Sequence, residues 1–302
     1  MEPYFSGMGL EVAGRCNAKC MFCTWGNDPE IKHKNVFTGE IITRSNDKIS
    51  LDLVDRIIDE HQLKLIIFTG VCEPLLAPDR IFYIAEKSLN NDFKFALYTN
   101  GTLLTEEISR KLLSYPTYSS LNISLNAASD SMRRNVMGLP LDKAEENFIK
   151  FLDIRKEMDR EKDVPVGCVM MLTPINRGEE NIFRRKWKEI FSRYKNCQEP
   201  GVFNSNNWDG SVKNYWMNTK NPQSCGQWNT NSPTISVDGY IYLCCYSSRF
   251  VFGHVLDPDA VSRWFRRKEI FKVVNDAGGQ YPMELCGECS MRFESSWKRK
   301  ER

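Results

Sequence analysis

The chain has 302 residues, of which 41% are hydrophobic and 26% are charged, and both fractions are ordinary for a globular protein. Its 41 basic and 39 acidic residues leave a net charge of +2, which gives no reason to expect a nucleic-acid or acidic-membrane partner. No apolar run approaches the roughly 18 residues needed to cross a bilayer, and the first cysteine comes too early to leave room for a signal peptide. We therefore expect a cytoplasmic protein with one large core, or with a large and a small core.

The first predicted element is a strand over residues 8–12, in which apolar and polar residues alternate. In this pattern Glu11 points away from Leu10 and Val12, either towards a substrate or, more often, into a structural hydrogen bond. Residues 24–50 are polar and have no sustained periodicity. We expect them to form a long loop near the active site, where lids and substrate contacts are often found.

Three cysteines lie between these two segments, at Cys16, Cys20 and Cys23. Disulfides are not expected in a cytosolic chain of this length. Thiolates are soft ligands, and three from one short loop can hold three irons of a four-iron, four-sulfur cluster while leaving the fourth iron open. A structural zinc site is the alternative, but zinc sites usually use four ligands and the three histidines of the chain are scattered.

From Leu51 onwards, helical and strand patterns alternate. The predicted helices cover residues 51–58, 81–88, 105–113, 141–158 and 179–194, and the predicted strands cover residues 65–68, 93–98, 120–125, 166–172 and a region near 202. Repeated βα units with buried strands imply a parallel sheet, so we expect the α/β class and a partial (β/α)6 TIM-like barrel over residues 1–203. The cysteine loop follows the first strand, which places the active site at the carboxyl ends of all the strands.

Short motifs follow the next three strands, at the edge of the sheet where the cysteine loop is expected. Each motif alone is typical of an ordinary turn or helix cap, but their succession at neighbouring strand ends favours a binding site. The strand pattern gives Ser124 and Asn126 one side-chain direction, so both can face the pocket. The residues at these ends include Gly70, Glu73, Asn100, Ser124, Asn126, Arg133 and Arg134.

The C-x3-C-x2-C spacing, followed by βα repeats, resembles the radical S-adenosylmethionine (radical SAM) superfamily. This resemblance implies that the open iron binds SAM through its amino and carboxylate groups, and that Phe22 lies against the adenine. The segment Gly70–Glu73 is similar to the family's GGEP segment, which contacts the methionyl amino group, although Cys72 stands where the family commonly has glycine.

Two further motifs carry the same resemblance. Asn100 belongs to a Thr-Asn-Gly turn like that of the family, with Gly101 suited to a positive φ angle. The family also places a serine near the ribose, here Ser124, and an arginine on the SAM carboxylate, where a planar guanidinium fits. Sequence alone does not separate Arg133 from Arg134 for that role.

The βα rhythm stops after residue 203, and a hairpin with Asp-Gly at its turn is expected over residues 235–243. The spacing C-x13-G-x4-C followed by C-x2-C resembles the auxiliary-cluster domains called SPASM and twitch. No cysteine follows the last pair, so the resemblance implies a small α+β twitch-like domain over residues 204–302 with a second, auxiliary [4Fe-4S] cluster, for which structural zinc is the alternative. The implied ligands are Cys225, Cys244, Cys286 and Cys289.

Cys245 follows Cys244 directly, so on a strand the two side chains point to opposite faces. The glycine spacing selects Cys244 as the ligand. Resemblance to radical SAM epimerases such as neomycin C epimerase implies that Cys245 returns a hydrogen atom to a substrate radical. The alternative is a small buried apolar residue, which a cysteine outside a metal site often is.

The family resemblance implies that the reduced cluster splits SAM and that the resulting 5′-deoxyadenosyl radical abstracts a hydrogen atom from a C–H bond. The next step is either oxidation of a hydroxyl-bearing carbon, as in 2-deoxy-scyllo-inosamine dehydrogenase, or epimerisation. We expect a small sugar, cyclitol or aminoglycoside as substrate and a flavodoxin- or ferredoxin-type reductant. A peptide substrate stays open, and so does the different class of a non-catalytic iron-sulfur electron carrier.

Overall fold

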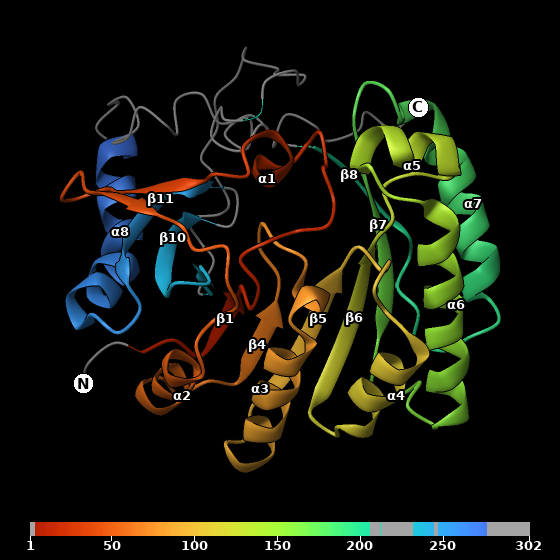
Figure 1. Ribbon diagram of the computed structural model, residues 1–302, viewed down its shortest axis with the longest axis horizontal. Helices are drawn as coiled ribbons and strands as arrows, with labels where there is room; N and C mark the ends of the chain where they lie inside the picture. Colours follow the sequence, from red (N-terminus) through yellow and green to blue (C-terminus); the bar gives the residue numbers. More distant parts are fainter. Residues whose placement is uncertain (1–3, 206–211, 213–231, 245–246, 277–302) are drawn as a thin grey trace.

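A computed structural model describes residues 4–205, 212, 232–244 and 247–276, with side chains described as far as residue 267. Across these residues one sheet of eleven strands runs in the order β3-β2-β11-β10-β9-β1-β4-β5-β6-β7-β8 (Figure 1). Its two parts differ in direction and in origin along the chain. We call β1 and β4 to β8 the parallel half, and β2, β3 and β9 to β11 the mixed half.

The parallel half has the predicted βα repeat. Its strands are β1 (Gly7–Leu10), β4 (Leu65–Phe68), β5 (Lys94–Thr99), β6 (Tyr118–Ser124), β7 (Val166–Leu172) and β8 (Gly201–Asn204). Its helices are α2 (Leu51–Glu60), α3 (Pro78–Asn90), α4 (Glu106–Ser114), α5 (Asp130–Met137), α6 (Leu141–Glu157) and α7 (Glu180–Phe191), with short 3-10 turns at Pro74–Leu76 and Arg177–Glu179. Each strand pairs in parallel with the next one of this set along the chain, which confirms the predicted partial (β/α)6 architecture.

Local sequence explains where these helices begin and end. Ser50 and Thr105 cap the starts of α2 and α4, because their side chains accept hydrogen bonds from the third backbone N–H beyond them. Ser129 does the same for α5, and Gly138 closes that helix in the left-handed conformation with φ of 70°. The cap at Ser129 fixes the direction in which α5 leaves the end of β6, which matters for the site below.

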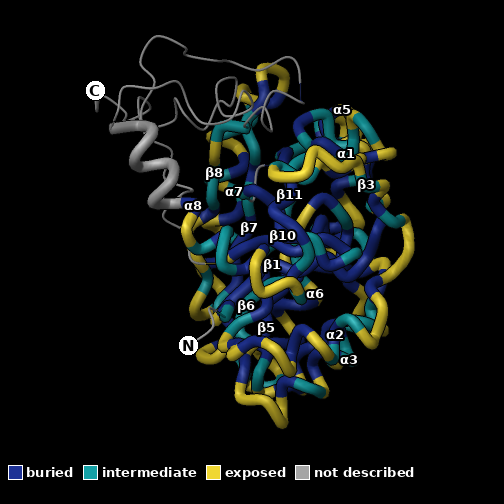
Figure 2. Tube along the Cα trace, turned by 90° about the vertical axis from the view of Figure 1, so that its left-hand side faces the viewer, coloured by how far each residue is buried: buried dark blue, intermediate teal, exposed yellow. Residues whose placement is uncertain are grey.

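The core lies between the parallel strands and the helices, whose apolar faces turn towards the sheet. β4 has the sequence LIIF, in which Ile66 and Phe68 are 1% and 0% exposed. The rings of Phe148 and Trp187 pack in a tilted arrangement with centroids 5.0 Å apart and bring α6 and α7 together. In Figure 2 the buried residues follow the sheet through the middle of the molecule, and the exposed ones lie along the outer helices and loops.

The mixed half corrects one expectation, because residues 24–50 are not simply a long loop. They form α1 (Thr24–Asn27), β2 (Lys32–Asn35) and β3 (Ile41–Thr43). β2 pairs antiparallel with β3, and it also pairs with β11 (Ser247–His254), a strand more than 200 residues later in the chain, so the polar sequence KHKN has one local and one distant partner strand. Periodicity within the segment cannot reveal such a pairing.

The expected hairpin is present between β9 (Thr234–Ile235) and β10 (Tyr240–Cys244). Gly239 has φ of 84° at its turn, a conformation that glycine adopts without strain. Helix α8 (Pro258–Asp276), which no sequence pattern above predicts, packs on β10 and β11. Along the described chain, no helix combines the length and apolar character of a membrane span.

The two halves meet where β9 pairs in parallel with β1, through Gly9 opposite Thr234 and Leu10 opposite Ile235. The sheet therefore continues across the junction. The domain boundary expected between residues 203 and 204 remains a prediction, because the segment that follows it lies mostly outside the described residues.

Candidate metal and cofactor site

The three cysteines lie on the loop that joins β1 to α1, at the carboxyl end of the parallel strands. The backbone N–H groups of Lys19 and Met21 donate to the carbonyls of Met137 and Val136, at 2.8 and 3.0 Å, which fastens the loop to the end of α5. Gly26 packs so closely on the backbone of Cys20 that any side chain there would collide with it. The thiols are therefore carried by a loop that is held from two sides.

The environment of these thiols is electrostatically unusual. Burial raises the pKa of Cys16 to about 12 and that of Cys23 to about 11, and the pKa of Cys20 is also raised. Mutual repulsion adds to the burial for Cys20, whose thiol feels the charges of both other cysteines, so the three groups lie near one another. Backbone N–H groups oppose these shifts, including that of Ala18, 3.4 Å from the Cys16 sulfur. Bound metal cations would offset this repulsion with their own positive charge and so keep the thiols deprotonated.

In the described chain, no three His, Cys, Asp or Glu side chains are close enough to one another to hold a single metal ion. Three soft thiolate donors on one short loop suit a cluster in which each thiolate binds a different iron.

Glu73 joins the cysteine loop to two strand ends. Its side chain accepts hydrogen bonds from the N–H of Leu75 at 3.1 Å, from the hydroxyl of Thr99 at 2.5 Å and from the N–H of Asn100 at 2.9 Å. The N–H of Glu73 donates to the carbonyl of Arg15, next to Cys16. Burial raises the pKa of this carboxyl, while the N–H of Asn100 and the hydroxyl of Thr99 oppose the shift. Both carboxylate oxygens are thus held by the protein itself.

The turn after β5 also contacts the cysteine loop. The side-chain amide of Asn100 donates to Asn17 at 2.7 Å, and Asn17 donates to the hydroxyl of Thr102 at 3.0 Å. Gly101 has φ of 81°, as expected for a turn that only glycine enters freely. Asn100 therefore fixes the orientation of the loop between the first two cysteines.

The structure separates the two candidate arginines. Arg133 is fully buried and donates to the carbonyls of Leu125 and Asn100, at 3.1 and 2.6 Å, and its Nε–H is buried with no partner among the described residues. Burial lowers its pKa to about 10, and the nearby Cys20 acts in the opposite direction. Arg134 points outward and pairs with Asp130. A buried cation with an unused donor beside the thiols suits an anionic ligand group, and of the two arginines only Arg133 has this character.

The remaining candidates lie around the same edge. Phe22 is 9% exposed and packs with Ala18 and residues of α5. Ser124 is half-buried, and the strand ends there. Asn126 has φ of 63° and is held by Met171, whose N–H donates to its side chain at 2.8 Å. The expectation that Ser124 and Asn126 share one side-chain direction does not hold, because strand alternation stops at Ser124 and the chain turns into the left-handed region at Asn126.

Gly70 follows β4 and has φ of 128°, and a side chain at this position would collide with the carboxylate of Glu11. Sequence reasoning left the role of Glu11 open, and the structure resolves it as a structural hydrogen-bonding group. Glu11 is fully buried and accepts from the N–H of Val71 at 2.8 Å, from Arg44 at 2.7 and 3.2 Å, and from the hydroxyl of Tyr242 at 2.9 Å. One carboxylate therefore connects three parts of the chain: the segment after β4, Arg44 just after β3, and strand β10.

Sequence reasoning did not anticipate Arg44 and Tyr242 in this network. The alternation around Tyr242 marks a strand, but its partner Glu11, directly after β1, lies 231 positions away, so the pair becomes visible only in the structure. A buried arginine in an otherwise polar stretch gives no local signal at all.

The second predicted centre is described only in part. Cys244 ends β10, is half-buried, and lies near the guanidinium of Arg267, whose pKa burial lowers to about 10 while Cys244 raises it. Cys225, Cys245, Cys286 and Cys289 lie outside the described residues. The auxiliary cluster and the role of Cys245 therefore stay predictions.

Three soft thiolate donors beside a buried, incompletely bonded arginine, at the carboxyl ends of parallel βα strands, define a site for an iron-sulfur cluster with a charged cofactor. A family comparison agrees with this class, since the Radical SAM superfamily matches residues 10–184, more than half of the chain. The chain belongs to the radical SAM superfamily. Membership implies a [4Fe-4S] cluster and SAM as cofactors.

Among curated proteins, the radical SAM cyclopropyl synthase TigE of Paramaledivibacter caminithermalis is 21% identical over 287 residues, which cover 83% of this chain and 60% of that protein. The AdoMet-dependent heme synthase of Methanosarcina barkeri is 29% identical over 130 residues, covering 43% of this chain and 34% of the synthase. The chain thus spans less than two thirds of the length of either relative.

Solved structures resemble the whole described fold. The structure of anSMEcpe with bound AdoMet and Cp18Cys peptide has a TM-score of 0.58 at 13% identity, and covers 94% of this chain and 87% of its own. Streptococcus suis SuiB bound to precursor peptide SuiA has a TM-score of 0.50 at 13% identity, covering 96% and 70%. At these identities the likeness establishes the fold alone.

Proposed function

We propose that this protein is a SAM-cleaving radical enzyme that abstracts a hydrogen atom from a C–H bond of a peptide substrate. The observation that carries the proposal is the juxtaposition of three thiols on one fastened loop with the buried guanidinium of Arg133. A non-catalytic electron carrier needs neither an open iron nor an anion-binding arginine beside it, so this arrangement favours the enzyme.

In this proposal, Cys16, Cys20 and Cys23 hold the cluster, which when bound supplies the electron that splits SAM and so generates the hydrogen-abstracting radical. Arg133 binds the SAM carboxylate through its unused Nε–H, with its other donors fixed by backbone carbonyls. The backbone of the Gly70–Glu73 segment receives the methionyl amino group.

The other residues of this edge orient the ligand. Phe22 packs beside the adenine, and Ser124 binds near the ribose. Asn100 and Asn126 hold the surrounding backbone through their own hydrogen bonds and so act as positioning residues. Glu73 has the same role, because the protein itself already binds its carboxylate.

The choice of a peptide substrate departs from the small sugar, cyclitol or aminoglycoside expected above. The comparisons give no support to those compounds, whereas two structures of similar fold contain peptides.

A second [4Fe-4S] cluster on Cys244 with Cys225, Cys286 and Cys289 would accept or pass an electron after hydrogen abstraction. A flavodoxin- or ferredoxin-type protein would supply the first electron. The substrate radical is then either oxidised or epimerised, and Cys245→Ala distinguishes these two reactions. Epimerisation needs a hydrogen donor and should stop in the variant, whereas oxidation needs none and should continue.

The test uses anaerobically reconstituted protein with SAM and dithionite. We expect 5′-deoxyadenosine and a change in the electron paramagnetic resonance spectrum of the reduced cluster when SAM is added. Cys20→Ser should abolish both signals, and the matched control Cys197→Ser, a half-buried cysteine away from the loop, should retain them. Wild-type protein that binds iron yet forms no 5′-deoxyadenosine would point to an electron carrier instead.

The same assay separates the two arginines. Arg133→Lys keeps the charge but loses the planar fork, so we expect SAM affinity to fall at least about tenfold, while Arg134→Lys leaves it unchanged. Iron content and melting temperature show whether each variant is folded and loaded. Equal SAM affinities for the two variants would remove Arg133 from the site.

A further inference from the structure

A charged pocket lies beside the cysteine loop and has no part in the function proposed so far. It has a volume of about 420 Å³ and opens between α1, which begins directly after Cys23, and strands β2 and β11. Figure 1 shows α1 and β11 on the side of the molecule towards which the strands of the parallel half point. The lining residues are Asp28, Glu30, Lys32, Lys34, Arg249 and Phe250.

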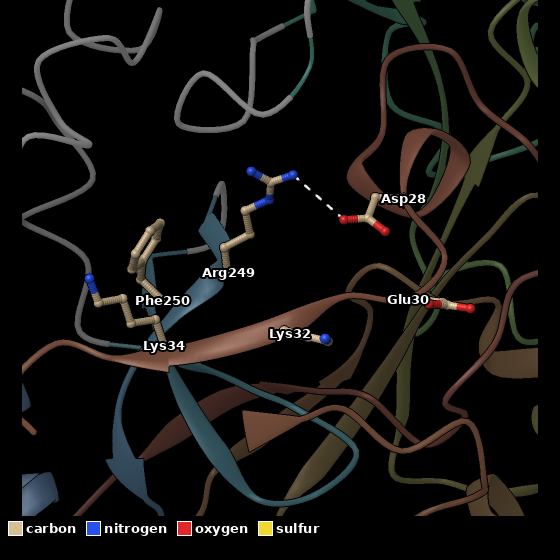
Figure 3. A pocket seen from close by; sticks show the side chains of 6 residues that line it. All are labelled: Asp28, Glu30, Lys32, Lys34, Arg249 and Phe250. Atoms are coloured by element: carbon tan, nitrogen blue, oxygen red, sulfur yellow. Dashed lines mark ion pairs between the residues drawn. The ribbon is translucent and has the colours of Figure 1, made fainter. Parts of the chain in front are cut away.

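The charges of this pocket are unequally compensated. Arg249 faces Asp28 at 3.6 Å, and Figure 3 shows the guanidinium extending towards that carboxylate. Lys32 and Lys34 are exposed and form no ion pair with any described residue. Glu30 extends away from them in the same view. The lining therefore presents two ammonium groups that no carboxylate of the pocket neutralises.

The strand fixes the spacing of these two lysines. They alternate with His33, which is fully buried and bonded to the carbonyl of Ser248, so both ammonium groups point to the solvent side. Residues two apart on a strand are roughly 7 Å apart and share one face. The cross-strand neighbours of Lys32 and Lys34 on β3 are Thr43 and Ile41, neither of which carries charge. On the other side Lys34 lies opposite Phe250, which adds an apolar wall.

We propose that this pocket is a substrate-binding site for an acidic peptide segment with two carboxylates one residue apart, a proposal that rests on the function proposed above. An extended Glu-Xaa-Glu segment has the same spacing as the two lysines and presents both carboxylates on one face. β2 already has a neighbour on each side, so the segment lies over the face of the sheet and does not extend it as a further strand. Figure 3 shows the two lysine side chains extending in different directions from the strand, so each ammonium group meets a separate carboxylate and contributes selectivity for the acidic peptide.

The test measures binding of a short fluorescein-labelled peptide with a Glu-Ala-Glu centre, and of its Gln-Ala-Gln twin, to reconstituted protein with SAM. We expect the acidic peptide to bind at least about tenfold more tightly than the twin, and this preference to shrink at high ionic strength. The charge-reversed variant K32E/K34E should lose the preference. The control variant K94E/K156E reverses two exposed lysines elsewhere, at the start of β5 and the end of α6, and should keep it.

Equal binding of the two peptides, binding of neither, or an equal loss in both variants overturns the inference. Glutarate that competes as well as the acidic peptide would assign the pocket to small diacids and also overturn it. 5′-Deoxyadenosine formed without peptide is measured in parallel, and K32E/K34E should retain it within about twofold because the cluster loop is unchanged. If wild-type protein forms no 5′-deoxyadenosine, the proposed function is wrong. If it forms 5′-deoxyadenosine but binds the two peptides equally well, only the inference about the pocket is wrong.

Discussion

The parallel half of the sheet is assembled from strands that follow one another along the chain, whereas the mixed half combines residues 32–43 with residues 234–254. Apolar strands and helix faces hold the first together, as in β4, where Ile66 and Phe68 are buried. The second adds its own buried apolar residues, such as Ile235 and Ile241, to the same core, and a buried polar network of Glu11 with Arg44 and Tyr242 ties it to the end of β1. The comparison teaches that the two halves share one apolar core but that the mixed half also depends on this network, so perturbing the network should separate them.

The largest expected effect comes from removing the carboxylate at the junction. Glu11→Ala leaves the guanidinium of Arg44 buried without its counter-charge, and we expect a loss of about 3–5 kcal/mol in the free energy of unfolding. Urea denaturation of reconstituted protein measures it. The control Asp79→Ala breaks the exposed pair with Lys48 and should cost less than about 1 kcal/mol. Similar losses in both variants would mean that the polar junction does not hold the halves together.

The second-largest expected effect comes from acidification, which should lower the stability of the mixed half more than that of the parallel half. Burial lowers the pKa values of His33, His61 and His254 in the folded protein. Between their usual pKa, about 6.5, and the lower folded values, the unfolded chain binds more protons than the folded one. Stability is therefore complete above about pH 6.5 and falls on acidification, by up to about 1.4 kcal/mol per histidine and pH unit.

Hydrogen exchange at about pH 5.5 and about pH 7.5, corrected for intrinsic rates, locates this effect. His33 lies on β2 and His254 on β11, so protection should fall in β2, β10 and β11 before it falls in β5 and β6. His33→Gln should flatten the pH dependence. An equal loss of hydrogen-exchange protection in both halves would contradict the predicted difference in their sensitivity to acid.

The smallest effect concerns one hydroxyl. Tyr242→Phe removes the bond from β10 to Glu11 but keeps the ring and both partners of the ion pair, so we expect a loss of about 1–2 kcal/mol. The matched control is Tyr98→Phe on β5, whose side chain is 45% exposed and whose hydroxyl makes no hydrogen bond to the described residues. Melting temperatures of the two variants provide the measurement, and a control that falls as far as Tyr242→Phe would exclude a specific link.

Sequence reasoning reached the parallel half because its signals are local. Apolar runs such as that of β4, and motifs at strand ends, lie within a few residues of the structure they specify. It missed β2 because the sequence KHKN contains no apolar residue, and one of its two partner strands lies more than 200 residues away. It also could not choose between Arg133 and Arg134, since adjacent positions on a helix differ only in what surrounds them.

The pairing of β1 on both sides has a consequence for biosynthesis. β4 covers one edge of β1 soon after it is made, but β9, which covers the other edge, is synthesised only after the whole parallel half. At usual translation rates that interval is on the order of ten seconds or more. Until β9 is made, the nascent chain therefore carries an open strand edge next to its cysteine loop.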